Sequence, residues 1–110
     1  MTNDNVKQDS IIDIDFVMTN DNVKQDTTIN IDAATRGLLL RMGNDRVEQG
    51  ELRQAEDVYL KIIKEYPGSE ESETAQSRLM AISRGYEKDG LFRLSLDVLE
   101  RIEQTLATNV

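Results

Sequence analysis

The chain of 110 residues is long enough for one small domain, and its net charge of −8 with a pI near 4.5 argues against nucleic acid or an anionic membrane surface as a partner. It contains neither cysteine nor histidine, which excludes disulfides and thiolate chemistry and removes the commonest general base and metal ligand. No apolar run approaches the roughly 18 residues that span a bilayer, and no secretory signal pattern opens the chain, so we expect a cytoplasmic protein without a membrane segment.

The same nine residues, MTNDNVKQD, occur at 1–9 and again at 18–26. The residues that follow also correspond, Ile12 with Ile29 and Ile14 with Ile31, so the repeated unit is 17 residues long. Three explanations fit: a tandem duplication of a docking strand, a leader copy added before an original start at Met18, or a combination of two variant N-termini. The second copy leads straight into the helical part of the chain, which favours Met18 as the ancestral start.

The two copies form an acidic N-terminal arm of residues 1–32, and residues 1–34 carry a net charge of −5. Each copy ends in alternating apolar and polar residues, which is the period of a half-buried strand. A lone strand is stable only on the edge of a sheet supplied from elsewhere. We therefore predict that the arm is extended, or else disordered, and that at least one of its strands pairs with another chain. The arm residues predicted to enter pockets of that partner are Ile12, Ile14, Phe16, Ile29 and Ile31.

Four helices are predicted in the rest of the chain, over residues 33–49, 51–66, 69–89 and 91–106. In each, apolar residues recur every three or four positions, the spacing of one face of a helix. Glycines stand at the turns after the first and third helices, Pro67 ends the second, and Ser69 is the predicted N-cap of the third. Because the links are so short, we expect two antiparallel hairpins that form an all-α domain over residues 33–107.

Both hairpins carry a further pattern of spaced residues. The first reads Leu39-x2-Met42-Gly43-x2-Arg46, then Ala55-x3-Tyr59, then Pro67. The second, forty residues on, reads Leu79-x2-Ile82-Ser83-x2-Tyr86, then Ser95-x3-Leu99. Residues 35–106 thus resemble the tetratricopeptide repeat superfamily, whose pattern is W-x2-L-G-x2-Y, A-x3-F, P. Arg46 in place of an aromatic residue and the absence of a second proline depart from that pattern. The resemblance implies an α-solenoid in which small residues such as Gly43 and Ala55 let two helix backbones approach closely.

By this resemblance, the first helix of each repeat lines a concave groove that binds a peptide or a partner protein. The implied groove residues are Leu40, Asn44, Val47 and Glu48 in the first repeat and Ser77, Met80, Arg84 and Glu87 in the second. Asn44 and Arg84 are the candidates for holding a peptide backbone or carboxylate, although ordinary solvated residues would give the same pattern. The chain does not supply the basic residues used by the chaperone-binding members of the superfamily.

The last predicted helix is apolar on nearly all sides, and such a helix is usually buried on all sides. A solenoid needs at least about three repeats to cover its core, and this chain has two. We therefore expect the last hairpin to dock against another chain, or else to be covered by the folded-back arm. Leu94 and Val98 are the residues predicted to lie in that interface.

No feature of the sequence points to catalysis, a metal or a cofactor. No serine or threonine has a histidine to activate it, no glycine-rich phosphate loop is present, and the acidic clusters lack the glycine and closing glutamate of an EF-hand loop. We therefore predict a non-catalytic protein–protein interaction module, an accessory or adaptor subunit of a larger complex. The alternatives are a self-assembling homo-oligomeric structural protein and a dedicated chaperone for a partner segment.

Overall fold

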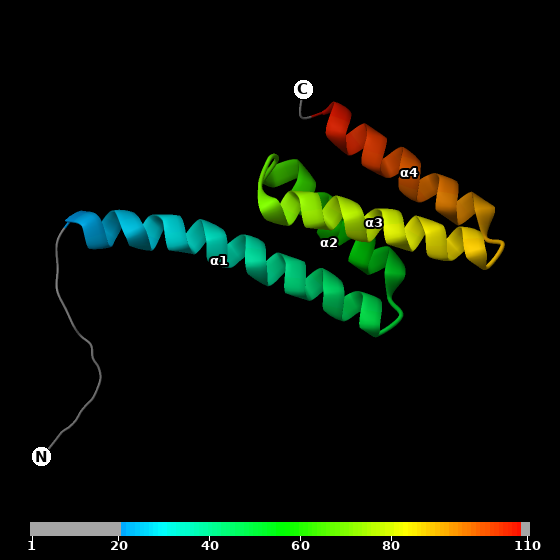
Figure 1. Ribbon diagram of the computed structural model, residues 1–110, viewed down its shortest axis with the longest axis horizontal. Helices are drawn as coiled ribbons and strands as arrows, with labels where there is room; N and C mark the ends of the chain where they lie inside the picture. The colour runs from blue at the N-terminus through cyan, green and yellow to red at the C-terminus, as the bar shows by residue number, and fades with distance from the viewer. Residues whose placement is uncertain (1–20, 109–110) are drawn as a thin grey trace, which may run out of the picture. The chain divides into compact units, whose positions relative to one another are not determined.

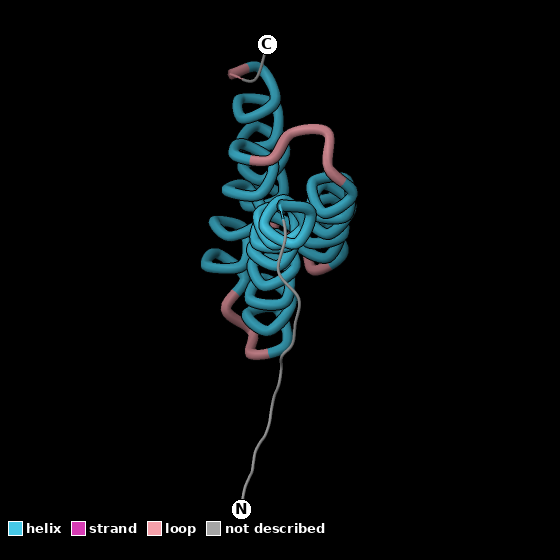
Figure 2. Tube along the Cα trace, turned by 90° about the vertical axis from the view of Figure 1, so that its left-hand side faces the viewer, coloured by secondary structure: helices cyan, strands magenta, loops and turns pink. Residues whose placement is uncertain are grey.

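The computed structural model describes residues 21–108, with side chains from residue 31 onward. Its helices, in chain order, are α1 (Asp21–Glu48), α2 (Leu52–Glu65), α3 (Glu70–Lys88) and α4 (Phe92–Ala107). Between residues 21 and 108 every regular element is a helix and none is a strand (Figure 2). The prediction of an all-helical body is therefore confirmed.

Glycine turns fold these helices into two antiparallel hairpins, α1 with α2 and α3 with α4 (Figure 1). Gly50 and Gly90 both have a φ of +78°, a left-handed conformation that side chains other than glycine rarely adopt. The amide after each glycine donates back into the helix, from Glu51 to the carbonyl of Arg46 at 2.9 Å and from Leu91 to the carbonyl of Tyr86 at 2.8 Å. This is the Schellman ending of a helix, so the same turn closes the first helix of each hairpin.

The link between the hairpins is the turn from α2 to α3. Gly68 has a φ of +81° there, and Ser69 caps α3 because its hydroxyl accepts the Ser72 amide at 3.1 Å. The first turn of α3 is acidic, which suits the positive end of the helix dipole. The cap predicted at Ser69 is confirmed.

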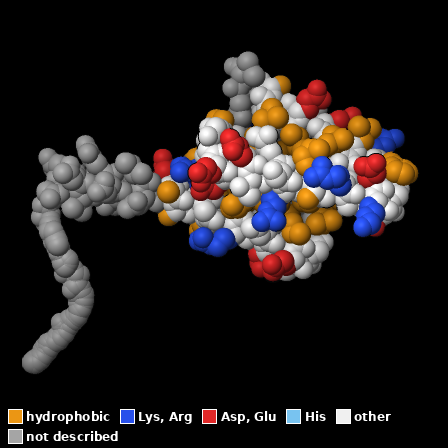
Figure 3. Space-filling view, in the orientation of Figure 1, with side chains coloured by type: hydrophobic (Ala, Val, Ile, Leu, Met, Phe, Trp, Pro, Cys, Tyr) orange, Lys and Arg blue, Asp and Glu red, His pale blue; other side chains and the backbone are white. Residues whose placement is uncertain are grey.

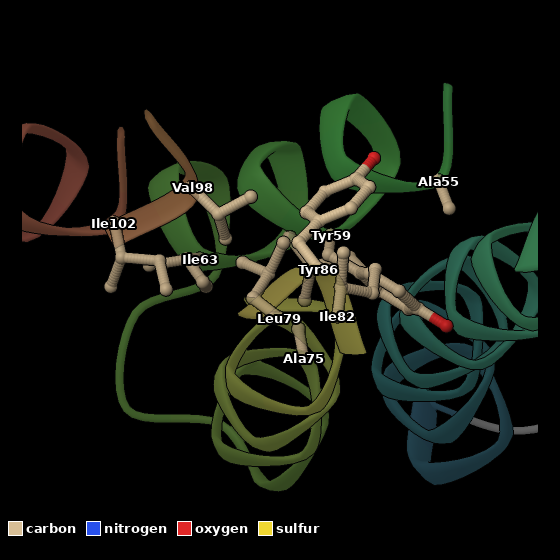
Figure 4. Close-up of a cluster of buried hydrophobic side chains, with 10 residues drawn as sticks. Ala55, Tyr59, Ile63, Ala75, Leu79, Ile82, Tyr86, Val98 and Ile102 are labelled. Carbon is tan, nitrogen blue, oxygen red and sulfur yellow. The ribbon is translucent and has the colours of Figure 1, made fainter. Parts of the chain in front are cut away.

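The hydrophobic core lies between α2, α3 and α4, and Leu39 and Leu40 of α1 pack against it. Its members recur at three- and four-residue steps, as expected for one buried face of each helix. The buried apolar residues are Ala55, Tyr59, Ile62, Ile63, Ala75, Leu79, Ile82, Tyr86, Val98 and Ile102 (Figure 4).

Small residues occur at equivalent places in the two hairpins. Gly43 is buried, and a Cβ atom placed on it would lie 2.5 Å from Cε1 of Tyr59. Forty residues later, Ser83 is buried against Ser95, with their hydroxyl oxygens 2.7 Å apart. The Ser95 hydroxyl also donates to the carbonyl of Ser83 at 2.8 Å. Side chains this small let α3 and α4 approach closely at that point.

From Asp21 onward, the second copy of the repeated segment and its continuation are helical, and this includes residues 29–32, where the sequence predicted a strand. Since α1 begins at Asp21, Ile29 and Ile31 lie in a helix, and Ile31 is 59% exposed. Starting a helix is costly, but extending one adds a hydrogen bond for each further residue. Extension from the predicted helix therefore outweighs an alternation only four residues long. The arm residues Ile12, Ile14 and Phe16 lie outside the described residues.

The chain divides into two units, residues 1–33 and 34–110. All the contacts described below belong to the second unit.

Candidate functional site

A groove of about 560 Å³ lies between α1 and α3, two helices that run in the same direction (Figure 1). Its volume is in the range of pockets that bury a ligand or a short segment of a partner. The residues around it come from the C-terminal half of α1, from α2, from one side of α3 and from the turn into α4. They are Asn44, Val47, Glu48, Leu52, Tyr59, Arg78, Ala81, Ile82, Gly85, Tyr86, Asp89 and Leu91.

Tyr59 forms a rigid part of the groove wall. Its side chain is fully buried, fits against the bare backbone of Gly43, and donates its hydroxyl proton to Oδ1 of Asn44 at 2.6 Å. Burial raises the pKa of Tyr59, and the charge of Arg78 opposes that rise only in part. The hydroxyl therefore remains a donor at neutral pH and fixes the amide of Asn44, whose NH2 group has no hydrogen-bond partner among the described residues.

Apolar and charged side chains alternate around the groove. Val47 and Leu91 are 36% and 46% exposed, which leaves apolar surface open to solvent. Glu48, Arg78 and Asp89 are exposed as well and make no ion pair within residues 31–108. Interleaved hydrophobic, basic and acidic side chains also cover the face of the molecule seen in Figure 3. Such a groove offers hydrophobic contacts, charges of both signs and one amide donor.

The structure brings only some of the predicted groove residues together. Asn44, Val47 and Glu48 line the groove, whereas Leu40 packs against the core. On α3 the predicted set Ser77, Met80, Arg84 and Glu87 is not among the lining residues. Met80 packs against the core, and the other three are exposed elsewhere on α3. Binding of a partner by any of these residues stays a prediction.

The reason for the difference on α3 is geometrical. The sequence-based choice used equivalent positions on the first helix of each repeat. Two parallel helices related by a translation present equivalent positions in the same direction, so positions of α1 that face α3 have counterparts on α3 that face away from α1. The true lining positions, Arg78, Ala81, Gly85 and Asp89, lie on the opposite edge of α3. Arg78, Ala81 and Gly85 each stand directly before a buried residue, and that signal could have identified them.

Leu94 and Val98, which were predicted to lie in an interface with another chain or with the arm, face the core of their own chain. Val98 is 1% exposed and belongs to the core of its own chain, and Leu94 packs partly buried against that core. Both lie on the side of α4 that faces α2 and α3, together with Ile102. Because the apolar sector of α4 is wider than its contact with the core, periodicity could not tell which part of that sector turns inward. The outward side carries Phe92, Leu96, Leu99 and Leu106.

A buried carboxylate joins the two hairpins, and the sequence analysis missed it. Glu56 of α2 is 0% exposed; its Oε1 lies 2.8 Å from Nη1 of Arg101 on α4 and 3.1 Å from Nη1 of Arg53. Tyr86 of α3 donates its hydroxyl proton to Oε2 of Glu56 at 3.3 Å. Burial raises the pKa of Glu56, and the charges of Arg53 and Arg101 oppose that rise.

Each arginine partner of Glu56 also contacts a second carboxylate. Arg101 also binds Asp57, and Nη2 of Arg53 lies 2.7 Å from Oδ2 of Asp97 on α4. Two guanidinium groups are thus shared among three carboxylates. We assign this cluster to holding α2 against α4. The signal in the sequence was the place of Glu56 on the apolar face of its helix, four residues after Leu52 and three before Tyr59.

No family model, curated protein or solved structure matches the chain. Within residues 21–108 no helix is both long and apolar enough to cross a membrane. The same part of the chain holds no group of three or more acidic, histidine or cysteine side chains placed to bind a metal ion. Inference about function therefore starts from the groove.

Proposed function

We propose that the protein is a non-catalytic protein–protein interaction module of the tetratricopeptide-like α-solenoid type, acting in the cytoplasm as an accessory or adaptor subunit. Its binding site is the groove between α1 and α3, and its ligand is a segment of a partner protein. The observation that carries this proposal is the combination, in one groove, of open apolar surface, an oriented amide and charges that make no ion pair within residues 31–108. A net charge of −8 makes nucleic acid an unfavourable alternative.

The solenoid type is supported by the likeness of the two hairpins. Each has small residues at the equivalent places, Gly43 in one and Ser83 with Ser95 in the other, and each first helix ends in the same glycine turn. The equivalent residues lie forty positions apart in the sequence. Parallel first helices and a groove between them follow from stacking one hairpin on the next.

The chemistry of the groove favours a peptide over a small apolar molecule. The NH2 group of Asn44 is placed to donate to a backbone carbonyl of the bound segment. Val47 and Leu91 offer apolar contact, while Arg78 supplies a basic charge and Glu48 and Asp89 supply acidic ones. A segment with apolar side chains and charges of both signs is therefore the best fit, because each groove charge would gain an opposite partner.

A displayed library of random peptides, selected on the full chain, tests the proposal. The blocking variant is Gly85→Leu, because Gly85 lines the groove and has open space where a side chain would be added. The matched control is Ser77→Leu, on an exposed position of the same helix that does not line the groove.

We expect the selected peptides to bind the parent chain and the Ser77→Leu variant alike, and to lose affinity for Gly85→Leu by roughly tenfold or more. Circular dichroism must show that both variants keep their helix content. Undiminished binding by Gly85→Leu, or a selection that yields no binding peptide, would argue that the groove is not a peptide site.

A further inference from the structure

Four large apolar side chains are exposed on the outer side of α4. Phe92 is 67% exposed, Leu96 51%, Leu99 39% and Leu106 39%. Their spacing is four, three and seven residues, which fits the d, a, d and d positions of a heptad repeat. Glu103 occupies the remaining a position. This α4 seam, defined as Phe92, Leu96, Leu99, Glu103 and Leu106, is the pattern by which one helix packs against another.

The two edges of the seam differ. The g positions, Ser95 and Ile102, are buried in the core of the chain itself. The e positions, Arg93 and Glu100, are exposed, carry opposite charges and make no ion pair within residues 31–108. A helix that packs on the seam therefore meets one charged edge, basic near the start of α4 and acidic seven residues later.

We propose that the α4 seam binds the α4 seam of a second copy of this chain, antiparallel and across a two-fold axis. In an antiparallel helix pair the e edges face each other, so Arg93 of each copy lies opposite Glu100 of the other. A parallel pair would set e positions against g positions, and here the g positions are already buried. The one open edge is thus complementary to itself only in the antiparallel arrangement.

The same features set the strength of the contact. One helix from each copy gives an interface at the small end of those that are stable in solution. Glu103 interrupts the apolar seam, and a polar residue at an a position fixes the register at a cost in stability. In the antiparallel register Glu103 approaches Arg93 of the second copy. We therefore infer a weak, reversible dimer that leaves the α1–α3 groove of each copy open.

Sedimentation of the full chain over a dilution series tests the dimer. The mass is expected to change between one and two copies as the concentration rises, and to go no further because a two-fold contact closes on itself. Leu96→Glu should weaken the dimer by roughly tenfold or more, because it places a carboxylate in the middle of the seam. Leu38→Glu is the matched control, since Leu38 of α1 is 52% exposed and Leu96 is 51% exposed.

Several results would overturn the proposal. They are a single-copy mass at every concentration, a mass that grows beyond two copies, and a dimer that is lost with Leu38→Glu but kept with Leu96→Glu. A chain that stays monomeric but still binds groove peptides would reject the dimer without touching the proposed function. Helix content measured for each variant separates loss of association from loss of folding.

Exchanging the two edge charges tests the antiparallel orientation itself. Arg93→Glu alone or Glu100→Arg alone sets like charges against each other across the axis, so each should weaken the dimer several-fold. The double variant restores opposite charges at both ends and should restore the affinity of the parent chain. Failure of the double variant to recover the dimer would reject the antiparallel pairing.

Discussion

Two glycines in the middle of helices show how differently the same residue type can be used. A Cβ atom on Gly43 would lie 2.5 Å from Cε1 of Tyr59, whereas one on Gly85 would have no neighbour within 4 Å. Glycine inside a helix is less stable than alanine by about 1 kcal/mol when nothing else intervenes. At Gly43 the ring of Tyr59 intervenes, because it is buried and bonded to Asn44 and has little room to move.

Alanine substitutions at these two positions should therefore have opposite effects on stability. We expect Gly43→Ala to lower the free energy of unfolding by about 1–3 kcal/mol through overpacking. Gly85→Ala should raise it by about 0.5–1 kcal/mol. Urea unfolding followed by circular dichroism measures both. Equal changes in the two variants would mean that Tyr59 does not fill the space at Gly43.

At the scale of the element, α4 shows where sequence periodicity reaches its limit. Its apolar residues fit a helix, and that helix is present. The side that turns inward depends on which surfaces α2 and α3 offer, and the sequence of α4 alone does not contain that information. Val98 and Ile102 meet the core, while Phe92 and Leu96 remain outside. Val98, the residue predicted to lie in an interface, is therefore part of the core of its own chain.

Truncating one residue from each side of α4 distinguishes the two orientations. We expect Val98→Ala to lower the free energy of unfolding by about 2 kcal/mol, because it opens a cavity in the core. Phe92→Ala removes more atoms, yet it should change stability by less than about 0.5 kcal/mol in dilute, monomeric protein. Thermal or urea unfolding of the two variants provides the measurement. If Phe92→Ala lowered the free energy of unfolding more than Val98→Ala did, α4 would be oriented with Phe92, and not Val98, toward the core.

For the whole molecule, local sequence signals predicted the two hairpins. They failed for features that depend on how one helix packs against another. Gly50, Gly90 and Ser69 act within one turn of their own positions, so the sequence alone located the helix ends. The groove edge of α3 depends on where α1 lies, and equivalence between repeats gave Met80, Arg84 and Glu87 in place of the observed edge. Residues 29–32 were predicted as a strand because apolar and polar residues alternate there, and helix extension from the C-terminal side overrode that preference.

Glu56 ties the two hairpins together at the level of the whole molecule. It touches α3 through Tyr86 and α4 through Arg101, so separating the hairpins would break both contacts. Burial raises its pKa from the ordinary value of 4.5, and Arg53 and Arg101 do not fully offset that effect. A carboxyl whose pKa is raised by folding holds its proton more tightly in the folded chain. Its contribution to stability is therefore complete below the ordinary pKa and declines as the pH rises through the raised value.

Glu56→Gln keeps the size of the side chain and removes this titration. As the pH rises from about 4 to 7, across the range in which glutamates titrate, the parent chain should lose stability relative to Glu56→Gln. Glu71→Gln is the control of opposite sign, because the hydrogen bond from Arg36 lowers the pKa of Glu71. Over the same pH range the parent chain should gain stability relative to that variant.

Urea unfolding of the three proteins at each pH measures both differences, in which the titration of all other carboxylates cancels. If the parent chain instead gained stability relative to Glu56→Gln as the pH rose, the attraction of the two arginines would outweigh the burial of Glu56. The folded chain would then favour the charged form of Glu56.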